Sequence, residues 1–280
     1  MNEGGRWVEP FMGSGVVGFN IKPDQAVFAD SNPYIIAIYK GINGGEITSG
    51  KVRAFLEREG AILEEKGQDH YYHIRERFNS KHAPLDFLFL NRSCFNGMIR
   101  FNSKGGFNVP FNHKPERFSK AYVTKVVNQV KDIEKLCQLK QWDFVCQDFR
   151  ETLKSVSRKD FIYCDPPYAG RHTDYFNAWG DAEDKELFEL LSKTKARFML
   201  STWHSNQYRE NEKITSYWSK FHLVTQNHFY HVGAKEKNRK PMLEALAMNY
   251  AVEEKEKKSY TKLNQAVQPQ LFEKNNNYTT

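Results

Sequence analysis

Short apolar runs recur along the chain, and helical patterns separate several of them. The clearest helical patterns between such runs lie at 32–42 and 181–193. Strands that alternate with helices favour an α/β fold whose sheet is mostly parallel and covered on both faces. The last two runs lack an intervening helix, so we expect an antiparallel pair at the sheet edge. The strand-like runs are Arg6–Pro10, Ala26–Asp30, Phe144–Asp148, Phe161–Asp165, Ala196–Thr202, Phe221–Phe229 and Leu243–Tyr250.

The alternation stops between about residues 46 and 141, where the pattern is charged and helical. Helices are expected at 51–66, 71–78 and 122–140, around a loop rich in glycine, asparagine and proline. Beyond residue 250 apolar residues are few and show no period, which is typical of disorder. The expected division is a catalytic sheet domain at 1–45 and 142–250, a helical insertion at 46–141 and a disordered tail at 251–280.

Composition narrows the class of partner. The 280 residues carry a formal charge of +7, and 14% of them are aromatic, which suits a polyanion with bases that can stack. No apolar run is long enough to span a bilayer, and the N-terminus lacks a signal pattern. The four cysteines show neither metal-ligand nor disulfide spacing. We expect a cytoplasmic protein that binds no metal and is a monomer or a weak dimer.

Asp165-Pro166-Pro167-Tyr168 is the most informative stretch, because it follows the buried-looking run 161–164. Ligands of open α/β sheets bind at the carboxyl ends of the strands. An amine conjugated to an aromatic ring becomes nucleophilic only if the site accepts both of its N–H groups. Asp165 and the Pro166 carbonyl can each accept one, and Tyr168 offers a face for the base. The alternative is a plain strand-to-turn junction with a helix-capping aspartate.

The segment Glu9-Pro10-Phe11-Met12-Gly13-Ser14-Gly15 follows the first run. Gly13 and Gly15 allow a tight turn and a close backbone approach to a ligand. Asp30 ends the second run, where an acid can accept ribose hydroxyls. Glu9 suits an ammonium group better than a phosphate, and no basic residue lies in the turn. Asp148 can accept from an adenine amine, or it caps the next helix.

Together these motifs resemble the Dam-type DNA adenine N6-methyltransferases, the α group of the D12 class. The most specific part is the stretch Leu90–Asn102 followed by Gly106–Phe111. The resemblance implies a Rossmann-like sheet, S-adenosylmethionine as methyl donor and double-stranded DNA as substrate. It also places Phe11, Asp30 and Asp148 around the donor.

The loop between about 92 and 111 has side chains that suit DNA. Asn96 matches the Hoogsteen edge of adenine, and Arg100 matches guanine. Phe95 can wedge into a base step, and by resemblance it fills the position of an intercalating tyrosine. The alternative is a polar surface loop with an aromatic cap. The predicted DNA contacts are Arg92, Phe95, Asn96, Arg100, Asn102, Lys104, Pro110 and Lys114, with Arg117 and Lys120 as further phosphate contacts.

Other functions stay open at this stage. Dam-type enzymes usually carry a further segment with a Lys-x-x-Gly-Gly-Lys-like motif ahead of the first strand, and only Met1–Gly5 precede it here. A truncated, DNA-binding relative with little catalysis is therefore the main alternative. RNA, a small molecule or cytosine N4 are other possible acceptors. GATC is compatible with Arg100 and Asn96, but a role in restriction–modification, in a phage or in housekeeping cannot be read.

Overall fold

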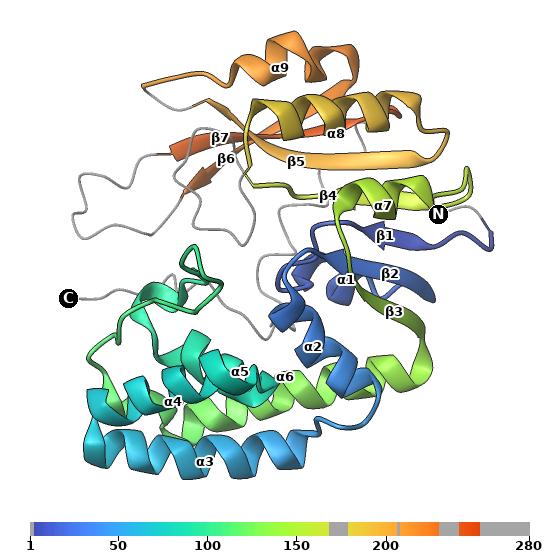
Figure 1. Ribbon diagram of the computed structural model, residues 1–280. Helices are drawn as coiled ribbons and strands as arrows, with labels where there is room; N and C mark the ends of the chain where they lie inside the picture. Colours follow the sequence, from blue (N-terminus) through green and yellow to red (C-terminus); the bar gives the residue numbers. More distant parts are fainter. Residues whose placement is uncertain (1–2, 168–178, 206–207, 230–240, 253–280) are drawn as a thin grey trace.

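The computed structural model describes residues 3–167, 179–205, 208–229 and 241–252. Within these residues a seven-stranded sheet has the order β3-β2-β1-β4-β5-β7-β6 (Figure 1). The first five strands are parallel, and β7 is antiparallel to both β5 and β6. This confirms the predicted α/β class with an antiparallel edge pair. The strands are β1 Trp7–Glu9, β2 Gln25–Asp30, β3 Gln141–Cys146, β4 Phe161–Cys164, β5 Arg197–Ser205, β6 His222–Phe229 and β7 Pro241–Met248.

The helices fall into two groups in space (Figure 1). One group lies along the sheet, and the other, formed by α3 to α6, lies beyond its β3 edge. The sheet-associated helices are α1 Val16–Ile21, α2 Pro33–Asn43, α7 Phe149–Lys154, α8 Asp181–Lys193 and α9 Glu212–Ser216. The second group is α3 Ser49–Lys66, α4 Gln68–Lys81, α5 Pro84–Ser93 and α6 Lys120–Leu139.

Helix α5 extends to Ser93, so it shortens the loop that was predicted between about residues 92 and 111. Pro84 starts the helix at its first turn, where a proline costs no hydrogen bond. Every residue from Asp86 to Ser93 is buried. A helix buried on all sides has no polar stripe, so its sequence lacks the period by which helices are recognised.

The sheet has a separate hydrophobic core on each face. Because side chains alternate along a strand, Tyr163 of β4 faces one core while Ile162 and Cys164 face the other. The second core is covered by α7, α8 and α9, with Phe149, Leu187 and Ile214 among its members.

The first core continues without interruption from the sheet into the helices beyond β3. Tyr34 of α2 contacts Phe78 of α4 and Phe101 of the following loop, with ring centroids 5.0 and 5.1 Å apart. Phe78 in turn stacks on Phe87 of α5 at 5.5 Å. These shared aromatic contacts fix α4 and α5 relative to the sheet.

Several predicted boundaries differ from the structure by one to three residues, among them those of the third strand and of the helix expected at 71–78. The third strand begins at Gln141 and ends at Cys146, because Asp148 is already the N-cap of α7. The expected helix 71–78 is the longer α4, which begins directly after Gly67. In the described ranges no helix is long and apolar enough to cross a membrane. The predicted tail lies, from residue 253 onward, outside the described residues.

Candidate active site and DNA-facing loop

The strand order reverses between β1 and β4. From β1 the chain proceeds outward through β2 and β3, whereas β4 and β5 extend the sheet in the other direction. Open α/β sheets bind ligands at such a switch point, outside the carboxyl ends of the strands. The glycine turn follows β1 there, and Asp165 follows β4. The structure therefore brings the two main sequence motifs to one edge of the sheet.

The glycine turn has a backbone that other residues rarely adopt. Gly13 and Gly15 have φ angles of 47° and 67°, in the left-handed region that favours glycine. A Cβ atom on Gly15 would lie 2.5 Å from the ring of Phe19. The turn carbonyl of Ser14 accepts a hydrogen bond of 2.8 Å from the Tyr39 hydroxyl. The turn is thus held rigidly against α2.

Asp30 shapes this turn. One carboxylate oxygen accepts the N–H of Gly13 at 2.9 Å, and the other accepts the N–H of Asn32 at 2.8 Å. Burial raises the pKa of Asp30, although these two backbone hydrogen bonds act in the opposite direction. The position of Asp30 at the end of an apolar run predicted a ribose contact, but no local pattern indicated that its side chain ties the ends of β1 and β2 together.

Glu9 is buried at the end of the central strand, with 2% of its surface exposed. Its Oε2 atom accepts a 2.9 Å hydrogen bond from the indole Nε1 of Trp7. A Cβ atom on Gly18 would lie only 2.7 Å from the same oxygen. Burial raises the pKa of Glu9 to about 8, against the Trp7 hydrogen bond, and the charges of Asp165 and Asp30 add to the rise. Three acidic side chains therefore influence one another at the switch point.

An aromatic cluster lies beside the glycine turn. Phe11 stacks on Phe149 and meets the edge of Trp179, in both cases with ring centroids 5.3 Å apart. Asp148 caps α7 through the N–H of Arg150 and pairs with the Arg150 guanidinium at 3.0 Å. Asp148 therefore caps α7 in the structure, and its predicted contact with an adenine amine stays a prediction.

Asp165 is exposed at the end of β4, while the next residue, Pro166, is buried. The strand residue before it, Cys164, is fully buried, and burial raises the pKa of its thiol. The structure thus provides an open carboxylate on a rigid base. Tyr168, the fourth residue of the motif, lies outside the described residues.

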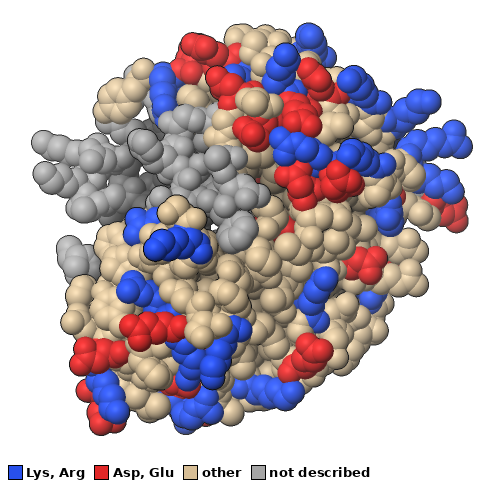
Figure 2. Space-filling model, in the orientation of Figure 1, with Lys and Arg blue, Asp and Glu red and all other residues tan. Residues whose placement is uncertain are grey.

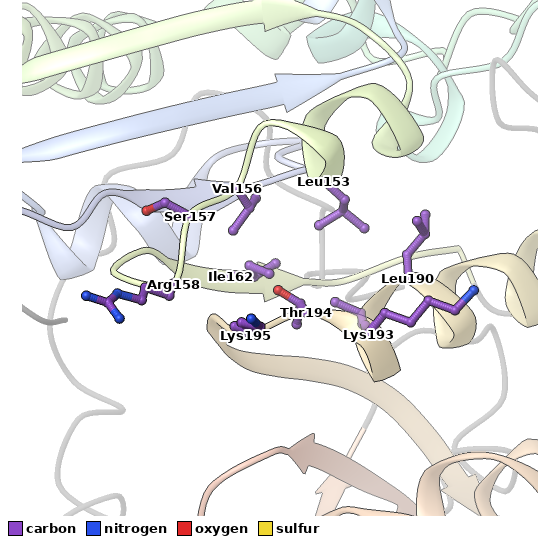
Figure 3. A pocket seen from close by; sticks show the side chains of 10 residues that line it. Leu153, Val156, Ser157, Arg158, Ile162, Leu190, Lys193, Thr194 and Lys195 are labelled. Carbon is purple, nitrogen blue, oxygen red and sulfur yellow. The ribbon is translucent and has the colours of Figure 1, made fainter.

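A cavity of about 350 Å³ lies at the other end of the strands from Asp165. In Figure 3 the side chains of Leu153, Val156 and Ile162 line it near the segments that precede β4 and β5. It therefore lies at the amino ends of the strands, away from Asp165. A much smaller cavity touches Pro166, Pro167 and Trp203 at the carboxyl ends.

Residues 94–111, here called the 94–111 loop, fold back on themselves after α5. The loop rises from the helical region on the side where the strands end (Figure 1). The Phe95 N–H donates to the Pro110 carbonyl at 2.8 Å. Two isolated bridges pair Cys94 with Phe111 and Phe101 with Phe107. The loop thus has a defined conformation without regular strands.

Helix α4 anchors one arm of the 94–111 loop. The Tyr71 hydroxyl donates to the Val109 carbonyl at 2.7 Å. Asn79 accepts the Phe107 N–H at 2.8 Å and donates to the Phe107 carbonyl at 3.2 Å. Phe107 and Val109 are buried, whereas Pro110 is exposed. The sequence analysis missed Tyr71 and Asn79, because single polar residues on a helix give no signal of a loop contact.

Three predicted DNA-contacting residues lie on the other arm. Phe95 is a large apolar residue with 49% of its surface exposed. Exposing so much apolar surface to water is unfavourable, so a contact that covers the ring would stabilise it. Asn96 adopts a left-handed conformation with φ 58°, which asparagine tolerates better than most residues. Arg100 donates to the Asn108 side chain at 2.9 Å and to its carbonyl at 3.3 Å. Asn108 therefore fixes the direction of this guanidinium.

Arg92 corrects the predicted set of DNA contacts. It is 2% exposed, and its guanidinium donates to the Tyr122 hydroxyl at 3.0 Å and to Gln129 at 3.5 Å. Its carbonyl accepts the Nε–H of Arg117 at 3.0 Å. The prediction that Arg92 contacts DNA at the surface was wrong, because Arg92 is buried and joins α5 to α6 beneath the loop.

Basic side chains surround the 94–111 loop. Figure 2 shows them where the helical region faces the sheet. Lys104, Lys114 and Lys120 are exposed, and none of the three forms an ion pair within the described ranges. Asn102 is exposed as well, but its Oδ1 atom accepts the N–H groups of Lys104 and Gly106 and closes the tight turn at the loop tip. Residues 235–240, four of which are lysine or arginine, lie outside the described residues.

The described residues contain no group of three or more side chains arranged to hold a metal ion. His70, one of the histidines paired in sequence with His73, is buried and lies 2.9 Å from a Glu59 oxygen. It belongs to an ion-pair network between α3 and α4.

Comparison with known proteins gives the same assignment as the motifs. Residues 1–232 match the family of D12 class N6 adenine-specific DNA methyltransferases. A DNA adenine methylase of Haemophilus influenzae is 31% identical over 217 residues, which cover 71% of this chain and 69% of that protein. The Retron Ec67 DNA adenine methylase of Escherichia coli is 35% identical over 185 residues, covering 62% of this chain and 60% of that protein.

The similarity also extends to a restriction–modification enzyme. The Type II methyltransferase M.FokI of Planomicrobium okeanokoites is 26% identical over 256 residues, which cover 87% of this chain and 39% of that protein. The family match covers β1 to β6, the glycine turn, Asp165 and the 94–111 loop together. The chain belongs to the D12 class of N6 adenine-specific DNA methyltransferases.

Proposed function

We propose that this chain transfers a methyl group from S-adenosylmethionine to N6 of an adenine flipped out of duplex DNA. The observation that carries the proposal is the convergence of Glu9, Asp30 and Asp165 at the sheet's switch point, beside a glycine turn. An acidic edge favours a cation, and S-adenosylmethionine carries a sulfonium and an ammonium group. The same charges disfavour the pyrophosphate of a dinucleotide.

The residues around the turn fit such a donor. Gly13 leaves room for a close approach of the ligand to the backbone, because nothing lies within 4 Å of the place where a Cβ atom would be. Phe11 provides an aromatic face beside the turn. We assign Asp30 to the ribose through its remaining lone pairs, and Asp148 to the adenine amine of the donor.

Asp165 and Pro166 would act on the acceptor amine. The carboxylate accepts one N–H of the adenine N6 group, and the Pro166 carbonyl accepts the other. The nitrogen lone pair is then directed out of the ring plane, towards the bound donor. When bound, S-adenosylmethionine supplies an electrophilic methyl group on a positively charged sulfur. The chain contributes mainly alignment and electrostatic stabilisation, with Pro167 and Tyr168 completing the wall on which the base stacks.

The insertion at 46–141 would provide the DNA contacts. N6 is hidden in a paired base, so the adenine must leave the duplex at a cost of a few kcal/mol. Phe95 is suited to fill the gap that the adenine leaves, and Asn96 and Arg100 to read base edges. Lys104, Lys114 and the exposed Pro110 would contact the flanking backbone. GATC is the first sequence to test.

Donor binding and methylation together test the proposal. Calorimetric titration should detect S-adenosylmethionine binding, and single-molecule sequencing of DNA from expressing cells should find N6-methyladenine within one short sequence. A protein that binds duplex DNA but neither binds the donor nor methylates would be the non-catalytic relative instead. Methylation of RNA in preference to duplex DNA would also contradict the proposal.

Phe95→Ala should slow extrusion of the target base. Stacking of an aromatic side chain on a base is worth roughly 1–3 kcal/mol, so we expect the rate to fall by about tenfold or more. The measurement is the fluorescence rise of 2-aminopurine placed at the target adenine. Phe95→Tyr keeps the ring and should behave like the wild type. An unchanged fluorescence response in the alanine variant would exclude the wedge role.

A further inference from the structure

Glu9 is unusual because a carboxyl group is buried in the catalytic half without any cationic partner in the described residues. Its Oε2 atom is held by the Trp7 indole at 2.9 Å and lies against Gly18 of α1. A side chain that is 98% covered cannot itself bind the donor. Glu9 therefore differs from the direct ammonium ligand that the sequence suggested.

Its surroundings determine which form of the carboxyl is stable. From β1 and α1 it meets two N–H donors, those of Trp7 and of the Gly18 backbone. It also interacts electrostatically with Asp165 and the thiol of Cys164, at the end of β4, and with Asp30, at the end of β2. Among the described residues the ionisable neighbours are thus acids, and burial with these neighbours keeps the pKa of Glu9 near 8. At pH 7 about nine tenths of the molecules then carry a neutral Glu9.

We propose that Glu9 is a positioning residue whose ionisation is linked to donor binding: when the cationic donor binds above it, Glu9 loses its proton to solvent. This inference rests on the proposed function, because it requires a positively charged ligand at the switch point. A cation outside the glycine turn stabilises the ionised carboxylate, just as the neighbouring acids destabilise it. The carboxylate then holds the donor electrostatically through the turn without touching it.

Because donor binding and proton release are linked, the direction in which donor affinity changes with pH can be predicted. A group whose pKa falls on binding releases protons, and the ligand binds more tightly as pH rises towards the pKa of the free protein. The donor's own amino group also titrates in this range. Glu9→Gln separates the two contributions, because glutamine mimics the neutral acid and keeps the hydrogen bond with Trp7. The affinity ratio of wild type to E9Q should rise roughly fivefold from pH 7 to pH 8.

The experiment is calorimetric titration of the full chain with S-adenosylmethionine in buffers of different ionisation enthalpy. At pH 7 the wild type should release close to one more proton per bound donor than E9Q releases. Trp7→Phe removes the hydrogen bond that lowers the pKa of Glu9, so its proton release should extend to higher pH. S-adenosylhomocysteine lacks the sulfonium charge and should release fewer protons.

The outcomes separate this inference from the proposed function. Donor binding with no buffer dependence, or with the same proton release in E9Q, would overturn the role of Glu9 and leave methyl transfer intact. If E9Q does not fold, the buffer dependence of the wild type and the shifted pH range of W7F decide the question. Absence of any donor binding by the wild type would overturn both.

Discussion

Asp165→Asn is expected to lower the rate of methyl transfer by about 10² to 10³, while affinity for duplex DNA changes little. The amide keeps the size of the side chain but presents an N–H₂ group or a weaker acceptor to the adenine amine. The lone pair of N6 then stays delocalised into the ring. Because Asp165 is exposed and follows a strand whose core residue, Cys164, is unchanged, the fold should persist.

Single-turnover transfer of labelled methyl groups and fluorescence anisotropy of a labelled duplex measure the two effects. The matched control is Asp143→Asn, an equally conservative change of an exposed aspartate within β3. It should leave both quantities unchanged. Near-normal turnover of the Asp165 variant would show that this carboxylate does not hold the amine, and the chemistry would have to be assigned elsewhere.

The sheet was predictable because its strands and helices have different periods and clear ends. Asp30 and Asp165 each follow an apolar run in the sequence, and the structure places them at the carboxyl ends of β2 and β4, the two strands that flank β1. Parallel strands bring such residues together whatever lies between them. The position of the active edge could therefore be deduced from local patterns alone.

The finer roles at this edge were not predictable, because they depend on partners distant in sequence. Asp30 reaches back 17 residues to the N–H of Gly13, a contact that only the folded turn creates. The hydrogen bond between Trp7 and Glu9 joins residues that face the same side of β1. The two-residue spacing of Trp7 and Glu9 can be read from the sequence. The burial of Glu9 cannot, because it depends on the packing of α1 against β1.

Arg92 shows the same limit in the helical region. In sequence it lies beside the loop and looks like a phosphate contact, since arginines near such loops are usually exposed. The fold instead turns it towards Tyr122 of α6. Because α5 is buried on all sides, periodicity gave no indication that residue 92 was still helical.

A buried ion-pair network in the helical region should be essential for its stability. Glu59 of α3 is 3% exposed and forms ion pairs with Arg58 and Arg77 at 2.9 and 3.3 Å. It also forms a 2.9 Å hydrogen bond with His70, whose pKa is lowered by burial. Arg77 also forms two hydrogen bonds with Asp86 of α5. The network therefore joins the three helices that support the 94–111 loop.

Glu59→Ala should lower the free energy of unfolding by about 1–3 kcal/mol, because it leaves the buried His70 and the partly buried Arg77 without a hydrogen-bond acceptor. Urea denaturation followed by circular dichroism measures this loss. The matched control is Glu57→Ala on the same helix. Glu57 is exposed and pairs only with Arg53 in the described contacts, so its loss should cost less than about 1 kcal/mol. Equal effects of the two variants would contradict the importance of the buried network.

The pH dependence provides a second test of the same network. Burial raises the pKa of Glu59, but the hydrogen bond from Arg58 and the charge of Arg77 outweigh it, so the net pKa lies below the usual 4.5. A carboxyl with a lowered pKa stabilises the fold above its unfolded pKa, and the contribution is lost as pH falls. The stability difference between wild type and E59A should therefore be full at pH 7 and shrink below about pH 4.5. Duplex affinity should fall along with stability, because Arg77 and Asp86 hold α4 and α5 beneath the loop that carries Phe95 and Arg100.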